Sequence, residues 1–242
     1  MAILRVVFFD AAGTLFDARQ PVGTTYARLA REFGLDASDA AVTAGFRRAF
    51  TNSPELAFGK GHSEAQLQSL ERAWWKEVVA RTFEGLGDFP RFDDFFEALF
   101  GFFADPKHWV VDPEASAALH RLKEQGLQLG VISNFDSRLY QILEDLELKP
   151  HFDSVTISSQ AGFAKPRREV FEAALAKHGL APAEALHVGD SVRLDFEAAD
   201  AVGMSAALLD PGLAGPVSIE DRRARIRSLA YLKEVTQVLG SA

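Results

Sequence analysis

Four segments of the sequence place a chemically capable side chain at or shortly after the end of a strand-like run. The first is Asp10, which closes the run 3–9 and is followed by Ala11-Ala12-Gly13-Thr14-Leu15. The run is rich in β-branched and aromatic residues, which is typical of a buried strand, and Gly13-Thr14 marks a turn. Asp10 is therefore expected at the carboxyl end of a core strand, where open α/β sheets build their ligand sites. A carboxylate in that place can act as a nucleophile toward phosphorus.

The other three segments repeat this arrangement later in the chain. The run 127–132 leads into Ser133-Asn134, the run 154–157 precedes Lys165-Pro166, and the run 185–188 leads into Gly189-Asp190, with Asp195 five residues further on. In chain order the motifs are Asp-x-x-Gly-Thr, Ser-Asn, Lys-Pro and Gly-Asp-x-x-x-x-Asp. This series resembles the four motifs of the haloacid dehalogenase (HAD) superfamily of hydrolases, and the resemblance spans nearly the whole chain.

The resemblance implies a catalytic pair and a metal site. Asp10 would attack phosphorus to form an aspartyl-phosphate, and Lys165 would stabilise the negative charge that develops on the transferring group. Mg²⁺ would be held by the Asp10 and Asp190 carboxylates and by the backbone carbonyl of Ala12, an all-oxygen set that suits this ion. Asp195 would belong to the same metal site, where it could orient bound water or the ligands.

The resemblance also implies a pocket for the phosphate group of a small phosphorylated metabolite. Ser133 and Asn134 would line it, with hydroxyl and backbone N–H groups donating to phosphate oxygens at a helix N-terminus. Gly13 and Thr14 in the first turn are assigned to the same pocket. His187 lies within a strand-like run, and we expect it to be a packed core residue.

Ala12 departs from the usual phosphatase motif, which has a second aspartate at this position. A methyl group can neither protonate a leaving oxygen nor activate water, so we expect a slow phosphatase unless another group such as Asp17 or His62 supplies the proton. The match is with a poorly characterised HAD branch that shares this alanine. Two alternatives stay open, a phosphonatase-like C–P hydrolase with Lys60 as its cap lysine and a weakened HAD protein with a binding role. A dehalogenase is disfavoured, because that branch lacks the acidic motif at 189–190.

Composition sets further bounds on function. The chain has 242 residues, 48% of them hydrophobic and 25% charged, with a net charge of −8 and a pI near 5.3. An acidic chain of this kind is a poor partner for nucleic acid. It has no cysteine, which excludes disulfides and thiolate chemistry. We find neither a signal pattern nor an apolar run of membrane-spanning length, so we expect a soluble cytoplasmic protein without a membrane partner. No feature of the sequence defines an oligomeric state.

The elements that must position these residues fall into two groups. Between 17 and 109 the apolar residues recur at helical spacing in four stretches, which predicts a helical bundle. From 110 onward, helices and strands alternate, with strands expected at 127–132, 153–158, 184–189 and 204–209 and a short strand near 225–228. Such alternation indicates a parallel sheet covered by helices on both faces. We therefore predict a Rossmann-like three-layer α/β core, residues 1–16 and 110–242, with an inserted α-helical bundle cap, residues 17–109.

Overall fold

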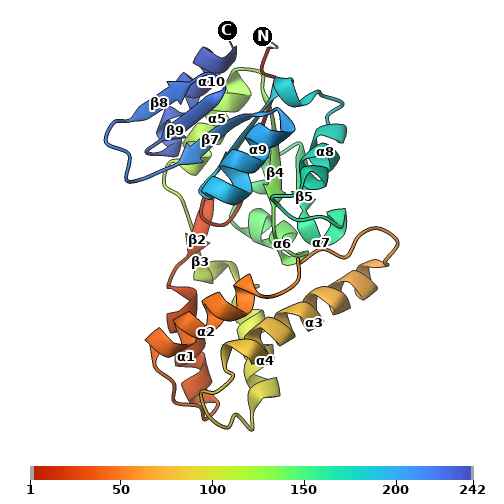
Figure 1. Cartoon of the computed structure of the whole chain (residues 1–242), viewed down its shortest axis with the longest axis vertical. Coiled ribbons are helices and arrows are strands. Elements are labelled where there is room, and N and C mark those ends of the chain that lie inside the picture. Colours follow the sequence, from red (N-terminus) through yellow and green to blue (C-terminus); the bar gives the residue numbers. More distant parts are fainter. Residues whose placement is uncertain (1–2, 241–242) are drawn as a thin grey trace. The chain divides into compact units, whose positions relative to one another are not determined.

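The computed structural model describes residues 3–240, and the chain forms two compact units (Figure 1). The first, here called the core unit, contains the described parts of 1–17, 57–61 and 111–242. The second, here called the helical unit, contains residues 18–56 and 62–110. Each unit is described in turn.

A seven-stranded sheet forms the centre of the core unit, in the order β5-β4-β1-β6-β7-β9-β8. All neighbouring strands are parallel except β8 and β9, which form an antiparallel pair at one edge. β1 lies between β4 and β6 and is completely buried, as its continuous apolar run predicts. The strands are β1 (Val6–Phe9), β4 (Gln128–Ser133), β5 (Ser154–Ile157), β6 (Ala185–Gly189), β7 (Ser205–Leu209), β8 (Val217–Glu220) and β9 (Arg223–Ile226).

Helices cover both faces of this sheet, which gives the Rossmann-like three-layer α/β fold that the sequence predicts (Figure 1). On one face Val6 and Phe8 of β1 pack with apolar residues of α8 and α9 in a continuous buried cluster. On the other, α5 and α10 pack against each other. Side chains alternate along a strand, so β1 supplies both layers of the core. The helices are α5 (Ala115–Glu124), α6 (Arg138–Asp145), α7 (Ser158–Ala161), α8 (Arg168–Ala176), α9 (Glu197–Val202) and α10 (Leu232–Gly240).

The edge of the sheet differs from the sequence-based expectation. A single strand near 225–228 was expected, whereas the structure has a hairpin, with β9 beginning at Arg223 and β8 preceding it. The hairpin turns at Asp221, whose φ of 53° lies in the left-handed region. β8 is half-exposed at the edge, so its residues lack the continuous apolar run that marks the central strands.

The helical unit contains the four helices that the apolar spacing predicts, namely α1 (Val22–Glu32), α2 (Asp39–Thr51), α3 (Glu64–Thr82) and α4 (Phe92–Phe102). Tyr26, Phe83 and Phe95 belong to its own buried core. A capping box between Ser63 and Gln66 starts α3. Two short strands, β2 (Phe16–Ala18) and β3 (Trp109–Val111), pair where the chain passes from one unit to the other. Among residues 3–240, no helix is long and apolar enough to cross a membrane.

Candidate active site

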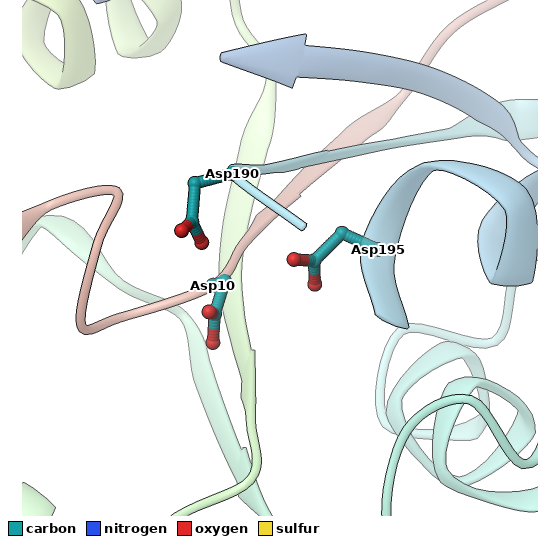
Figure 2. Close-up of side chains that lie close together, drawn as sticks. All are labelled: Asp10, Asp190 and Asp195. Atoms are coloured by element: carbon teal, nitrogen blue, oxygen red, sulfur yellow. The ribbon is translucent and has the colours of Figure 1, made fainter. Parts of the chain in front are cut away.

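Three carboxylates come together at the carboxyl ends of two neighbouring strands. Asp10 follows β1, and its N–H donates to Val188 O of β6 at 2.9 Å. Asp190 follows β6, and Asp195 lies five residues later in a single π-helical turn, Val192–Phe196. Each side chain offers one oxygen, and these three oxygens lie within 4.8 Å of one another. Figure 2 shows the three carboxylates close together, with those of Asp190 and Asp195 directed toward Asp10.

Two glycines allow this close approach. Gly13 has a φ of +89°, which favours glycine, and a Cβ at this position would lie 2.7 Å from Asp190 Oδ2. A Cβ on Gly189 would lie 2.2 Å from Asp195 Cγ. The glycines of the first and fourth motifs therefore make room for the carboxylates.

Lys165 provides the positive charge within this cluster. Its side chain is 1% exposed, and its Nζ lies 2.9 Å from Asp10 Oδ1 and 2.5 Å from Asp195 Oδ1. Asn134 holds the Lys165 backbone from both sides, because its Oδ1 accepts from Lys165 N at 2.7 Å and its Nδ2 donates to Lys165 O at 2.9 Å. Burial alone would lower the pKa of Lys165, but Asp10 and Asp195 outweigh it and hold the pKa above its usual range. The ammonium is therefore charged.

Asp195 is the most heavily engaged carboxylate of the three. Besides Lys165, its Oδ1 contacts His187 Nε2 at 2.9 Å, and its Oδ2 accepts from Ser191 N at 3.1 Å. Burial would raise the pKa of Asp195, yet Lys165 and the hydrogen bond from His187 keep it below its usual range. Asp195 is therefore a fixed anion that positions Lys165.

His187 is buried, as the sequence predicts, but its link to Asp195 was missed. The two residues come from different elements of the core unit, β6 and the turn that follows it. Only a polar side chain within an otherwise apolar strand hints at this hydrogen bond in the sequence.

The balance of charge indicates a place for a cation. Asp10, Asp190 and Asp195 bring three carboxylates to the cluster, while Lys165 is the ammonium that pairs with two of them. Burial raises the pKa of Asp190 to about 6, and the negative charges of Asp10 and Asp195 add to this effect. A cation would relieve that repulsion. An all-carboxylate donor set fits a hard ion such as Mg²⁺.

The residues assigned to the phosphate pocket lie at the end of β4 and in the turns that follow β1 and β4. Ser133 ends β4 and is buried, and Asn134 follows it and contacts Lys165. Thr14 lies in the turn after β1, and its buried hydroxyl has no hydrogen-bond partner among residues 3–240. Ala12 lies in the same turn, where it forms a β-bridge with Phe16. A buried hydroxyl without a hydrogen bond costs stability, and a hydrogen bond to a ligand would offset that cost. Thr14 is therefore a candidate to bind a ligand.

Three residues are candidates to replace the catalytic group that is missing at Ala12, and all three lie elsewhere in the chain. Asp17 is largely exposed. Partial burial of its carboxyl raises its pKa, and the nearby negative charge of Asp112 raises it further. A backbone hydrogen bond from Gly13 lowers the pKa but does not cancel these effects. Lys60 is exposed on the 57–61 segment, which the Phe58 N–H joins to Ser159 O at 3.1 Å within the core unit. His62 belongs to the helical unit.

Comparison with known proteins identifies a related family. Residues 4–203 match the model of the haloacid dehalogenase-like hydrolases. The chain is 36% identical over 221 residues to haloacid dehalogenase-like hydrolase domain-containing protein 3 of Bos taurus, covering 90% of this chain and 84% of the relative. It is 27% identical over 217 residues to rhythmically expressed gene 2 protein of Drosophila melanogaster, covering 85% and 82%.

Solved structures share the fold at low sequence identity. A HAD phosphatase from Thermococcus onnurineus superposes with a TM-score of 0.67 at 22% identity, covering 96% of this chain and 97% of that one. L-2-haloacid dehalogenase from Xanthobacter autotrophicus gives 0.66 at 18%, covering 97% and 99%. Because both phosphatases and dehalogenases have this fold, the chemistry must be argued from the site.

Proposed function

The chain belongs to the haloacid dehalogenase-like hydrolases, and on that premise we propose that it is a Mg²⁺-dependent phosphatase acting on a small phosphorylated metabolite. The convergence of Asp10, Asp190 and Asp195 around Lys165 carries this proposal. A reaction that brings a carboxylate against an anionic phosphate needs positive charge in the site. Loss of halide from carbon has no such requirement, so the excess of carboxylates favours phosphate chemistry.

Asp10 is the nucleophile in this proposal. Lys165 pairs with Oδ1 of Asp10, and we assign the attack to the other oxygen, Oδ2. In the first step a bond forms between Oδ2 and phosphorus while the bond from phosphorus to the leaving oxygen breaks. In the second, water attacks the same phosphorus and releases phosphate and the free carboxylate.

Lys165 and the metal would share the stabilisation of negative charge. Asp195 holds the Lys165 ammonium and the Asn134 amide holds the Lys165 backbone, so the ammonium needs no rearrangement as charge develops on the phosphoryl oxygens. Mg²⁺ would be held by Asp10 and Asp190, and when bound it would screen the nucleophile from the phosphate. Thr14 and Ser133 would donate hydroxyl hydrogen bonds to the phosphate.

Ala12 defines which leaving groups such a site can expel. Without an acid at this position, the leaving oxygen must take its proton from solvent. Aryl and acyl phosphates, whose leaving groups are weak bases, are therefore better substrates than alkyl or sugar phosphates.

The direct test is hydrolysis of p-nitrophenyl phosphate with Mg²⁺ and with EDTA. We expect turnover only with Mg²⁺, loss of turnover in Asp10→Asn, and an acid-stable phosphoryl adduct on the Asp10 peptide by mass spectrometry after rapid quenching. Asp36→Asn is the matched control, because this carboxylate is 93% exposed. Equal activity in Asp10→Asn, or activity in EDTA, would contradict the proposal.

A phosphonatase-like activity is the second candidate, favoured by Ala12 and by the position of Lys60 on the 57–61 segment of the core unit. Phosphonoacetaldehyde is therefore included in the assay. Turnover of this substrate that is lost in Lys60→Met, while p-nitrophenyl phosphate is not hydrolysed, would replace the phosphatase proposal by the phosphonatase.

A further inference from the structure

The helical unit contains a cavity of its own, of about 190 Å³, which the proposed reaction does not use. It is lined by residues 18–20, which lead into α1, by Thr25 and Arg28 of α1, and by Phe102, Phe103 and His108. Pockets for drug-sized ligands measure roughly 300–1,000 Å³, so this one suits a molecule of a few heavy atoms.

Arg19 brings a positive charge that its own contacts do not neutralise. Its Nε donates to Lys107 O at 3.0 Å and one terminal nitrogen donates to Trp109 O at 3.3 Å. Both acceptors are neutral backbone carbonyls, which orient the guanidinium group without cancelling its charge. A guanidinium held in this way is suited to binding an oxyanion.

Arg28 and His108 meet on the same aromatic ring. The guanidinium carbon of Arg28 lies 5.5 Å from the centre of the Phe102 ring, and the imidazole of His108 stacks on that ring at 3.3 Å. Arg28 also pairs with Glu32 at 2.8 Å. The cavity therefore combines an apolar wall with fixed groups that can bind an anion.

The charged groups that act on His108, taken together with the Glu32 partner of Arg28, sum to an excess of one positive charge. Burial is the main cause that holds the pKa of His108 below its usual range, and the cations around it act in the same direction, against Asp105. His108 is therefore counted as neutral. The cations are Arg19, Arg28 and Lys107, and the carboxylates are Glu32 and Asp105. This local excess occurs in a chain whose net charge is −8.

We propose that this cavity is a binding site for a small oxyanion, a carboxylate or a phosphate with a short apolar part. Arg19 and Arg28 bind the oxyanion, Phe102 packs against the apolar part, and His108 donates or accepts one hydrogen bond. Ala18 ends β2, Arg19 and Gln20 follow it, and His108 precedes β3, so the ligand contacts both segments through which the chain enters and leaves the helical unit.

Isothermal titration calorimetry with inorganic phosphate and with propionate tests the proposal and distinguishes the two ligand types. It is done with metal-free protein in a buffer without EDTA, because EDTA is itself a polycarboxylate. Without a cation, the excess of carboxylates in the acidic site repels anions. We expect saturable binding of at least one probe below about 10 mM. Arg19→Gln and Arg28→Gln should each weaken it at least tenfold, roughly the loss of one charge-assisted hydrogen bond.

Arg81→Gln is the matched control. Arg81 forms an i,i+4 ion pair with Glu77 at 2.8 Å, as Arg28 does with Glu32, but it lies outside the cavity. Its removal should leave the dissociation constant unchanged. As a second measurement, the ring signals of His108, assigned by their loss in His108→Asn, should shift during titration of the wild-type protein. Equal affinity in all variants, no saturable binding, or unmoved His108 signals would overturn the proposal.

Discussion

Replacement of Lys165 by methionine tests the charge arrangement of the core unit without reference to any substrate. Methionine has nearly the same shape, so the change removes the ammonium and little packing. In the wild-type protein the ammonium lies 2.9 Å from Asp10 and 2.5 Å from Asp195, and at an effective dielectric constant of about 20 each attraction is ~6 kcal/mol before desolvation. Desolvation offsets much of this, and removal of one partner from a buried pair costs ~3–5 kcal/mol net.

Thermal or urea unfolding in EDTA measures this loss. For a chain of this size the loss corresponds to a decrease in Tm of roughly 10 °C. With the ammonium gone, repulsion among the three carboxylates is no longer opposed, and uptake of a proton by the folded state relieves it. The folded state then takes up protons at a higher pH than the unfolded chain does. The loss of stability caused by Lys165→Met should therefore become smaller as the pH falls. Addition of Mg²⁺ should restore part of the stability.

Two further variants make the result specific. Lys123→Met breaks an ion pair of similar length, 2.7 Å to Asp153, but both side chains are at least one-third exposed, and we expect a loss of no more than about 1 kcal/mol. The double variant Lys165→Met/Asp195→Asn should be more stable than the sum of the single losses predicts, because it removes a charge that the first change leaves unpaired. Additive losses, or a Lys165→Met loss no larger than that of Lys123→Met, would refute the reasoning.

Four other predictions concern single positions. Ala12→Asp should raise turnover of alkyl phosphates by ~10–10³-fold and flatten the dependence of rate on leaving-group pKa, measured with a series of aryl and alkyl phosphates; an unchanged steep dependence would show that the new carboxylate does not reach the leaving oxygen. Asp190→Asn should abolish most of the increase in Tm that Mg²⁺ produces, since it removes a ligand, and an undiminished increase would place the ion elsewhere. Gly189→Ala should lower stability by about 1–3 kcal/mol in chemical unfolding, because its methyl group would overlap Asp195; wild-type stability would contradict the close contact. Burial lowers the pKa of His178, so as the pH falls the unfolded chain takes up a proton before the folded one does, and stability decreases below about pH 6.5. His178→Asn should therefore show a smaller decrease in Tm than the wild-type protein between about pH 7.5 and 5. An equal decrease would exclude His178 as the cause.

The fold, and the places of the motif residues at the ends of its central strands, were predictable because their signals are local. The central strands are buried on both faces and therefore read as continuous apolar runs, each ending in its motif. Register then follows from the parallel pairing, which places Phe9 opposite Val188 and so brings Asp10 near Asp190. The edge strand β8 was missed because it is half-exposed and lacks such a run.

The contacts that complete the site were not predictable, because they join distant parts of the chain. Asp195 bonds to both Lys165 and His187 through geometry that no periodicity encodes. The same holds for the 57–61 segment, where a backbone hydrogen bond from Phe58 to Ser159 joins residues 101 positions apart in the sequence. Local patterns identify elements and the side chains at their ends, whereas pairings between side chains depend on the assembled sheet.

The central place of β1 in the sheet has a consequence for synthesis on the ribosome. Val6 pairs with Gln128, 122 positions later, and with Ala185, 179 positions later. At roughly 5–20 residues per second, the nascent chain carries this apolar strand for many seconds before either neighbour has emerged. The contacts among α1 to α4 are local, so the helical unit can fold during that interval. The strand that precedes Asp10 is therefore the segment with the longest exposure to aggregation and to chaperones, and changes within it should reduce yield in the cell before they alter the folded enzyme.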